Sequence, residues 1–318
     1  MPGAVSRVRA TLVLGALAVV TLPLIPVQWL AMKTGGPVRR YLPVVWHRIA
    51  CALVGIRVRE VGRQAAGRPL LITANHVSWM DITVLGSRAP LSFVAKSEVA
   101  NWPVFGLFAK LQRSVFVDRQ RRSATARTAE ELGGRLAGGD AMVLFAEGTS
   151  NSGNEVLPFR SALIGAARHA VAGETGEMWI QPLAIAYTHL HGLPMGRQFR
   201  PHVAWYGDME MVPHFMNVVR QGGVDVTVVW GEPVRVEASA DRKALTRLLE
   251  ESVRSMAAEA VTGRDRIPPV EALPPSGAEP EDTAGVSDGE EDAADPQRTE
   301  RESPAGGAPA ILKSAEIR

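Results

Sequence analysis

The stretch "NHVSWMD" at residues 75–81 places a histidine and a carboxylate five residues apart, directly after the apolar run "LLITA". A turn from a strand into a helix can bring His76 and Asp81 within hydrogen-bonding distance. In such a pair the carboxylate fixes the imidazole tautomer, so the other ring nitrogen can accept a proton from a hydroxyl group. The same spacing fits a buried histidine beside a helix-capping aspartate. The pair therefore predicts either general-base chemistry or a purely structural contact.

A second polar loop follows another apolar run. The run "AMVLFA" leads directly into "EGTSNSGN", in which Glu147 and Gly148 come first. In α/β sheets, loops at the carboxyl edge collect binding and catalytic side chains. A simple turn between two elements has a similar composition, so that interpretation stays open.

The elements that must position these loops are short apolar strands that alternate with helical segments. The predicted helices cover residues 121–137 and 240–259. The predicted strands cover residues 70–74, 91–95, 114–118, 141–146, 179–187, 202–206 and 224–230. This alternation is typical of an α/β fold in which helices lie on the faces of a central sheet.

The N-terminal region is predicted to be a membrane helix. Residues 10–32 contain no formal charge and are flanked by basic residues. At about 1.5 Å per residue, roughly 20 helical residues cross a hydrocarbon core of about 30 Å, and we expect this segment to remain uncleaved. Pro23 and Pro26 interrupt the helical hydrogen-bond ladder, which leaves a kinked or interfacial arrangement open.

The next segment, residues 38–60, mixes arginines with aromatic and aliphatic residues. This pattern predicts a segment that lies at the membrane interface on anionic headgroups. The alternative is an ordinary amphipathic core helix.

Charge divides the chain into a basic body and an acidic tail. The 318 residues have a net charge of +2, and residues 264–318 hold 13 acidic and 6 basic residues, a net charge of −7. Residues 1–263 therefore carry +2 minus −7, or +9. The tail has few apolar residues and is predicted to be disordered. We expect membrane-anchoring and interfacial helices at 1–66, an α/β domain at 67–263 and the tail at 264–318.

Four ordered sequence blocks carry a resemblance to a known family. They are "NHVSWMD", "KSEVANWPVFG" with "SVFVDR", "FAEGTS" with "VLPFR", and "IQPLAIAY". In this order they resemble the glycerolipid acyltransferases, the family of 1-acylglycerol-3-phosphate acyltransferases. The resemblance implies a mixed central sheet flanked by helices, with N-terminal membrane helices. It also implies a location at the inner (cytoplasmic) membrane, with the acyltransferase domain facing the cytoplasm.

By this resemblance, the reaction is the transfer of a fatty acyl group from a thioester to the hydroxyl of a lysolipid. His76 would be the general base, and Asp81 would be its orienting partner. Glu147, Gly148 and Thr149 would belong to the acceptor site. Arg119 in "FVDR" would bind an anionic headgroup.

Two positions depart from the family's pattern, which has an arginine where this chain has Ser150 and a proline where it has Ala146. The arginine is associated with the acceptor phosphate, and a serine supplies no charge. Lysophosphatidate, which gives phosphatidic acid, is nevertheless the first expected acceptor. Lyso-ornithine lipid is the alternative, because "EGTSNSGNEVLPFRSAL" also resembles lyso-ornithine-lipid acyltransferases, whose acceptor carries no phosphate. Arg160 is a candidate for the replacement charge, and Lys96 is a weaker candidate contact.

The expected partners are an acyl carrier protein or coenzyme A thioester as donor, a lysolipid acceptor and the membrane surface, with no cofactor. No zinc-finger spacing and no aromatic–basic platform points to nucleic acid. His189 and His191 have no cysteine or carboxylate cluster to complete a metal site, so we expect no metal. A thioesterase-type hydrolase, in which the same pair activates water, is a weaker alternative. No G-x-S-x-G elbow follows a predicted strand, which argues against a serine nucleophile.

Overall fold

A mixed β-sheet organises the described part of the chain. The computed structural model describes residues 4–117, 122–165, 177–237 and 240–263. Within these residues the strands form a nine-stranded sheet in the order β1-β8-β6-β2-β5-β3-β4, with β7 and β9 paired to β6. The strands are β1 (Ile56–Val61), β2 (Leu70–Ala74), β3 (Leu91–Lys96), β4 (Val115–Val117), β5 (Ala141–Phe145), β6 (Glu177–Leu190), β7 (Leu193–Pro194), β8 (Val224–Trp230) and β9 (Val234–Glu237).

Strand directions make the sheet mixed, as the resemblance implied. β2 pairs in parallel with both β5 and β6, whereas β6 pairs antiparallel with β7, β8 and β9. All five residues of β2 are buried, as expected for a parallel strand whose sheet is covered on both faces. Each of its large aliphatic side chains contributes roughly 1.5–3 kcal/mol through burial.

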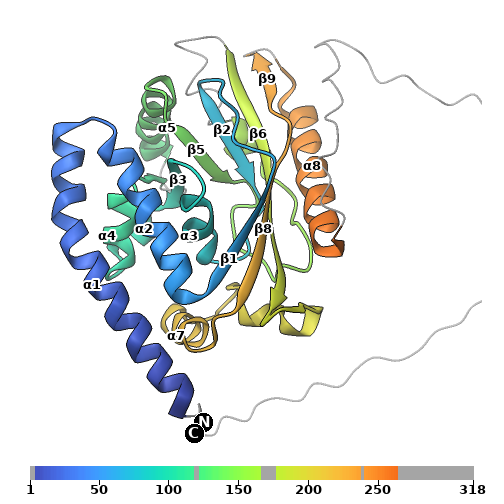
Figure 1. The fold of residues 1–318 in the computed structure, drawn as a ribbon. Helices are drawn as coiled ribbons and strands as arrows, with labels where there is room; N and C mark the ends of the chain where they lie inside the picture. Colours follow the sequence, from blue (N-terminus) through green and yellow to red (C-terminus); the bar gives the residue numbers. More distant parts are fainter. Residues whose placement is uncertain (1–3, 118–121, 166–176, 238–239, 264–318) are drawn as a thin grey trace, which may run out of the picture. The chain divides into compact units, whose positions relative to one another are not determined.

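Helices cover both faces of the sheet. They are α1 (Ala4–Thr34), α2 (Val38–Val54), α3 (Met80–Gly86), α4 (Phe105–Leu111), α5 (Arg122–Ala137), α7 (Met211–Gln221) and α8 (Arg242–Thr262), with the short 3₁₀ helices η1 (Ser97–Asn101) and η2 (Arg197–His202). One hydrophobic core joins α1, α2, α3 and α7 to the sheet, and a second joins α5 and α8 to it. Figure 1 shows α2 and α8 on opposite sides of the sheet.

The N-terminal helix α1 has both an exposed apolar surface and contacts with the body of the protein. Among the described residues it is the helix that is long and apolar enough to cross a membrane. It continues through Pro23 and Pro26. Near its start, Ala10 and Val13 are buried in the same core as the strands. The Arg9 guanidinium donates hydrogen bonds to the carbonyls of Val54 and Val219, which fixes this end of α1 to α2 and α7.

The structure confirms most predicted strands and corrects one. Residues 70–74 and 224–230 are the strands β2 and β8, as predicted. The predicted strand at 202–206 is wrong, because the N–H groups of Val203 and Ala204 both bond to the Arg200 carbonyl and close a helical turn.

β1 is not among the strands predicted from the sequence. β1 pairs in parallel with β8, although it lies on the N-terminal side of the expected boundary at residue 66. The two segments 1–66 and 67–263 thus share one sheet. We propose the boundary between them only as a division of roles, with membrane association in the first segment and acyl transfer in the second. The acidic tail at 264–318 lies outside the described residues.

Candidate active site

The register between β2 and β5 brings the two polar loops together. Ala74 pairs with Phe145 at the carboxyl ends of these parallel strands. His76 and Glu147 each follow two residues later, so they extend from neighbouring strands at the same level. The backbone N–H of His76 donates to Glu147 Oε1 at 3.0 Å, and the Asn151 N–H donates to the His76 carbonyl at 2.9 Å. The two motifs therefore form one site at the carboxyl edge of the sheet, where such sites collect.

His76 and Asp81 form a hydrogen-bonded pair. His76 Nδ1 lies 2.8 Å from Asp81 Oδ2, and the same oxygen accepts the N–H groups of Val77 at 2.7 Å and Ser78 at 3.0 Å. Asp81 is completely buried, whereas 19% of the His76 side chain is exposed. An ionised Asp81 only accepts hydrogen bonds, so it places the imidazole proton on Nδ1 and leaves the Nε2 lone pair available.

The alternative of a helix-capping aspartate does not describe this geometry. Trp79 occupies the N-cap position of α3, which has no side-chain cap, and Asp81 lies inside the first turn. Its carboxylate bonds backwards to the loop that carries His76. Asp81 thus orders the loop and orients the imidazole at the same time.

Two aromatic side chains that were not among the predicted site residues hold the pair in place. The Phe145 ring stacks on His76 with ring centroids 4.0 Å apart and planes inclined by 15°. The Tyr187 hydroxyl, on β6, donates to Asp81 Oδ1 at 2.7 Å. Tyr187 is buried at the end of the apolar run "PLAIAY" in β6, and a buried phenol needs a hydrogen-bond partner. That requirement was the available signal for Tyr187 in the sequence.

Glu147 is a buried carboxyl group whose pKa is raised to about 7. Burial is the main cause, and it outweighs the opposing hydrogen bonds from Asn151 and from the backbone N–H groups of His76 and Leu157. The Asn151 amide donates to Glu147 Oε2 at 2.6 Å, so both carboxyl oxygens have partners within the protein. Glu147 therefore connects its loop to the backbone of His76, and an additional role in acceptor binding remains a prediction.

The other candidate residues lie at different distances from this centre. Gly148 is buried and has a φ of 75°, a conformation that favours glycine, while Thr149 is exposed and Ser150 is half-buried. Arg160 is exposed, and its Nε donates to the Glu147 carbonyl at 3.1 Å, which places its charge beside the Glu147 loop.

Lys96 and Arg119 are not connected to the pair by the described contacts. Lys96 is exposed at the end of β3, and in the described part of the chain no hydrogen bond or ion pair joins it to His76 or Asp81. Arg119 lies outside the described residues. Within the described ranges, no cluster of three or more His, Cys, Asp or Glu side chains is placed to hold a metal ion.

Comparisons with known proteins point to acyl transfer. Residues 55–186 match the family model described as "Acyltransferase". The chain is 51% identical to a lyso-ornithine lipid O-acyltransferase from Brucella abortus, covering 82% of this chain and 98% of the relative. It is 47% identical to a lyso-ornithine lipid O-acyltransferase from Rhizobium meliloti, covering 82% of this chain and 90% of the relative.

Two more distant similarities are to proteins whose names specify a phosphate-bearing acceptor. A 1-acyl-sn-glycerol-3-phosphate acyltransferase from Neisseria gonorrhoeae is 31% identical, covering 63% of this chain and 74% of the relative. The crystal structure of the 1-acyl-sn-glycerophosphate (LPA) acyltransferase PlsC from Thermotoga maritima matches with a TM-score of 0.54 at 20% identity, covering 80% of this chain and 97% of that one. At this identity the structural match supports the fold.

Proposed function

Because this chain belongs to the PlsC-like acyltransferase family and is a lysolipid O-acyltransferase, we propose that its acceptor is lyso-ornithine lipid. The observation that carries the proposal is the identity of 51% and 47% to two lyso-ornithine lipid O-acyltransferases over nearly their whole length. The 1-acyl-sn-glycerol-3-phosphate acyltransferase from Neisseria gonorrhoeae is only 31% identical. Lysophosphatidate is the first acceptor expected from the sequence, and the comparisons favour the alternative, lyso-ornithine lipid.

The chemistry around Ser150 supports this acceptor. An ornithine headgroup carries a carboxylate and an amine and has no phosphate, so an arginine at position 150 is not required for a phosphomonoester. Ser150 is half-buried next to exposed Thr149, and the Arg160 guanidinium lies beside the same loop. We propose that Arg160 binds the headgroup carboxylate, because its planar guanidinium can donate two parallel hydrogen bonds.

His76 is the proposed general base. Its Nε2 takes the proton from the acceptor hydroxyl while Asp81 stabilises the imidazolium that forms. The hydroxyl oxygen then attacks the carbonyl carbon of the thioester. When the tetrahedral intermediate collapses, the carbon–sulfur bond breaks, the ester bond remains, and His76 returns its proton to the leaving thiolate.

An acyl donor and a membrane complete the proposal. We propose an acyl carrier protein or coenzyme A thioester as donor, since the dyad chemistry requires only a thioester carbonyl. The apolar surface of α1 supports association with a membrane. We propose that this is the inner membrane and that the site faces the cytoplasm, where both donors are made.

An acceptor competition assay tests the proposal. Purified full-length protein in detergent receives lyso-ornithine lipid and lysophosphatidate together, first with an acyl carrier protein donor and then with a coenzyme A donor. We expect acylation of lyso-ornithine lipid to exceed acylation of lysophosphatidate with the preferred donor. The opposite ratio would refute the acceptor assignment, and release of free fatty acid without either product would indicate a hydrolase. His76→Ala is the inactive control.

A further inference from the structure

A basic pocket lies at the sheet edge opposite the dyad. Its volume is about 370 Å³, and it is bordered by the turn between α1 and α2, by the first turn of α2, and by the residues that enter β2, β3 and β5. Arg68 lies two residues before β2, and His76 lies two residues after it. Five strand residues span about 16 Å, so this amino-edge pocket is separate from the catalytic groups.

The pocket holds more positive charge than its acidic residue can balance. The Asp140 side chain is only 6% exposed. Its carboxylate forms ion pairs with the guanidinium groups of Arg40, Arg113 and Arg135, with N···O distances of 3.0, 2.5 and 2.6 Å, respectively. These contacts hold its pKa below the usual value, because the two guanidinium groups of Arg135 and Arg113 outweigh the effect of burial. A single carboxylate is therefore already shared by three arginines.

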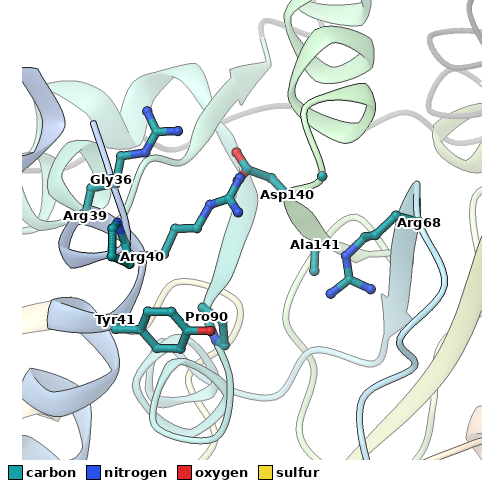
Figure 2. A pocket seen from close by; sticks show the side chains of 10 residues that line it. Gly36, Arg39, Arg40, Tyr41, Arg68, Pro90, Asp140 and Ala141 are labelled. Carbon is teal, nitrogen blue, oxygen red and sulfur yellow. The ribbon is translucent and has the colours of Figure 1, made fainter. Parts of the chain in front are cut away.

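Two further arginines, Arg39 and Arg68, line the pocket, and among the described contacts neither forms a hydrogen bond or ion pair with Asp140. The side chain of Arg68 donates to the carbonyls of Ala65 and Gly67 in its own loop. The Nε atoms of Arg39 and Arg40 are buried, and neither has a hydrogen-bond partner among the described residues. Figure 2 shows Arg40 extending toward Asp140 while Arg68 approaches from the other side, at the start of β2.

The arginines also affect each other. The pKa of Arg68 is lowered, first by burial and then by the positive charge of Arg40, which together outweigh the opposing charge of Asp140. The pKa of Arg113 is lowered by burial, by Arg135 and by Arg39. An anion that binds between such positively charged groups stabilises their charged forms, because it offsets their mutual repulsion.

We infer that the amino-edge pocket binds a phosphate group, supplied by an anionic lipid headgroup or by a free phosphate compound. Unpaired guanidinium N–H groups are suitable donors for phosphate oxygens. The volume exceeds what a single phosphate needs and leaves room for an attached glycerol. Tyr41 lines the pocket and is 57% exposed. Because the pocket also includes the turn that directly follows the apolar helix α1, it lies close to any membrane that α1 contacts.

The test uses two probes and one double variant, Arg39→Gln with Arg68→Gln, which leaves the Asp140 contacts intact. In the first arm, inorganic phosphate is titrated into detergent-solubilised full-length protein at constant ionic strength, and binding is followed by the rise in Tm. In the second arm, sedimentation with vesicles of phosphatidylcholine is compared with sedimentation with vesicles that also contain phosphatidylglycerol. Arg63→Gln with Arg247→Gln removes two exposed arginines outside the pocket and is the charge-matched control.

We expect the double variant to lose at least about tenfold in affinity for one of the two probes, while the control pair stays within twofold of wild type. Loss with phosphate indicates a soluble ligand, and loss only with phosphatidylglycerol indicates a lipid headgroup. Equal responses of both double variants in both arms would overturn the inference. Acyl transfer in detergent, which depends on the opposite edge of the sheet, verifies folding. If the double variant does not fold, Arg68→Gln alone gives the same test, because the hydrogen bonds of the Arg68 side chain are made to its own loop.

Discussion

Replacing Glu147 by glutamine should remove a pH dependence from the stability of the protein. The carboxyl group is 2% exposed, and burial raises its pKa from 4.5 to about 7. In the unfolded chain the proton leaves near pH 4.5, whereas in the folded chain it stays until about pH 7. Between these values the folded state binds more protons, so the free energy of unfolding must fall as the pH rises.

The magnitude follows from the size of the pKa shift. One pKa unit corresponds to 1.36 kcal/mol, so a shift from 4.5 to about 7 costs the wild-type protein about 3 kcal/mol by the time the pH exceeds 7. Glutamine has nearly the same shape and no titrating group. The stability of the wild type relative to Glu147→Gln should therefore be greatest below pH 4.5 and should decrease by about 3 kcal/mol as the pH rises through 7.

The measurement is urea denaturation in mild detergent at a series of pH values for both proteins. Taking the difference between the two curves cancels other titrating groups that they share. Glu155→Gln makes the same chemical change at an exposed position of the loop and controls for the loss of a carboxylate. Parallel curves for the wild type and Glu147→Gln would show that burial does not keep Glu147 protonated, and the reasoning about this loop would fail.

Three substitutions test the site through its activity. His76→Ala should lower the rate of acyl transfer by about 10²–10⁴-fold in a thioester turnover assay. His189→Ala, outside the site, should keep the wild-type rate. Full activity of His76→Ala would exclude His76 as the general base. Tyr187→Phe removes a hydrogen-bond donor to the buried Asp81 carboxylate, and such a bond is worth about 1.5–3 kcal/mol. The variant should therefore lower kcat/KM roughly 10- to 150-fold. An unchanged kcat/KM would mean that the Tyr187 hydroxyl does not help to position Asp81. Ser150→Arg should shift the ratio of lysophosphatidate to lyso-ornithine lipid turnover about tenfold toward lysophosphatidate, and an unchanged ratio in the competition assay would separate Ser150 from acceptor choice.

The parts of the site that sequence could predict are those formed by local chain geometry. His76 and Asp81 are five residues apart and meet within one strand-to-helix turn, so their spacing was informative. The contact between His76 and Glu147 spans 71 residues and depends on the pairing of Ala74 with Phe145. The order of the sequence blocks indicated that both loops lie at the carboxyl edge of the sheet. The register between the strands is a property of the folded sheet, and a shift of one residue would move every side chain of a strand to the opposite face.

The residues that were missed act across long separations or look ordinary in sequence. Tyr187 reaches Asp81 over 106 residues, from the end of the mainly apolar run "PLAIAY" in β6. Asn151 lies among turn-forming residues, and its contacts with Glu147 and with the His76 carbonyl, which distinguish it from them, form only in the folded chain. The wrongly predicted strand at 202–206 has a different cause. Its run of apolar residues resembles a short strand, but the N–H groups of Val203 and Ala204 bond to the Arg200 carbonyl and form a helical turn.

The attachment of α1 to the body has a practical consequence for anyone who wishes to study this enzyme in water. Deleting the first helix to gain solubility would remove Ala10 and Val13 from a core that also contains the strands, and would leave the carbonyls of Val54 and Val219 without their Arg9 donor. Such a truncated protein should aggregate because of its own exposed interior. Detergent, nanodiscs or redesign of the outward surface of α1 are therefore better routes to a soluble, active preparation than removal of this helix.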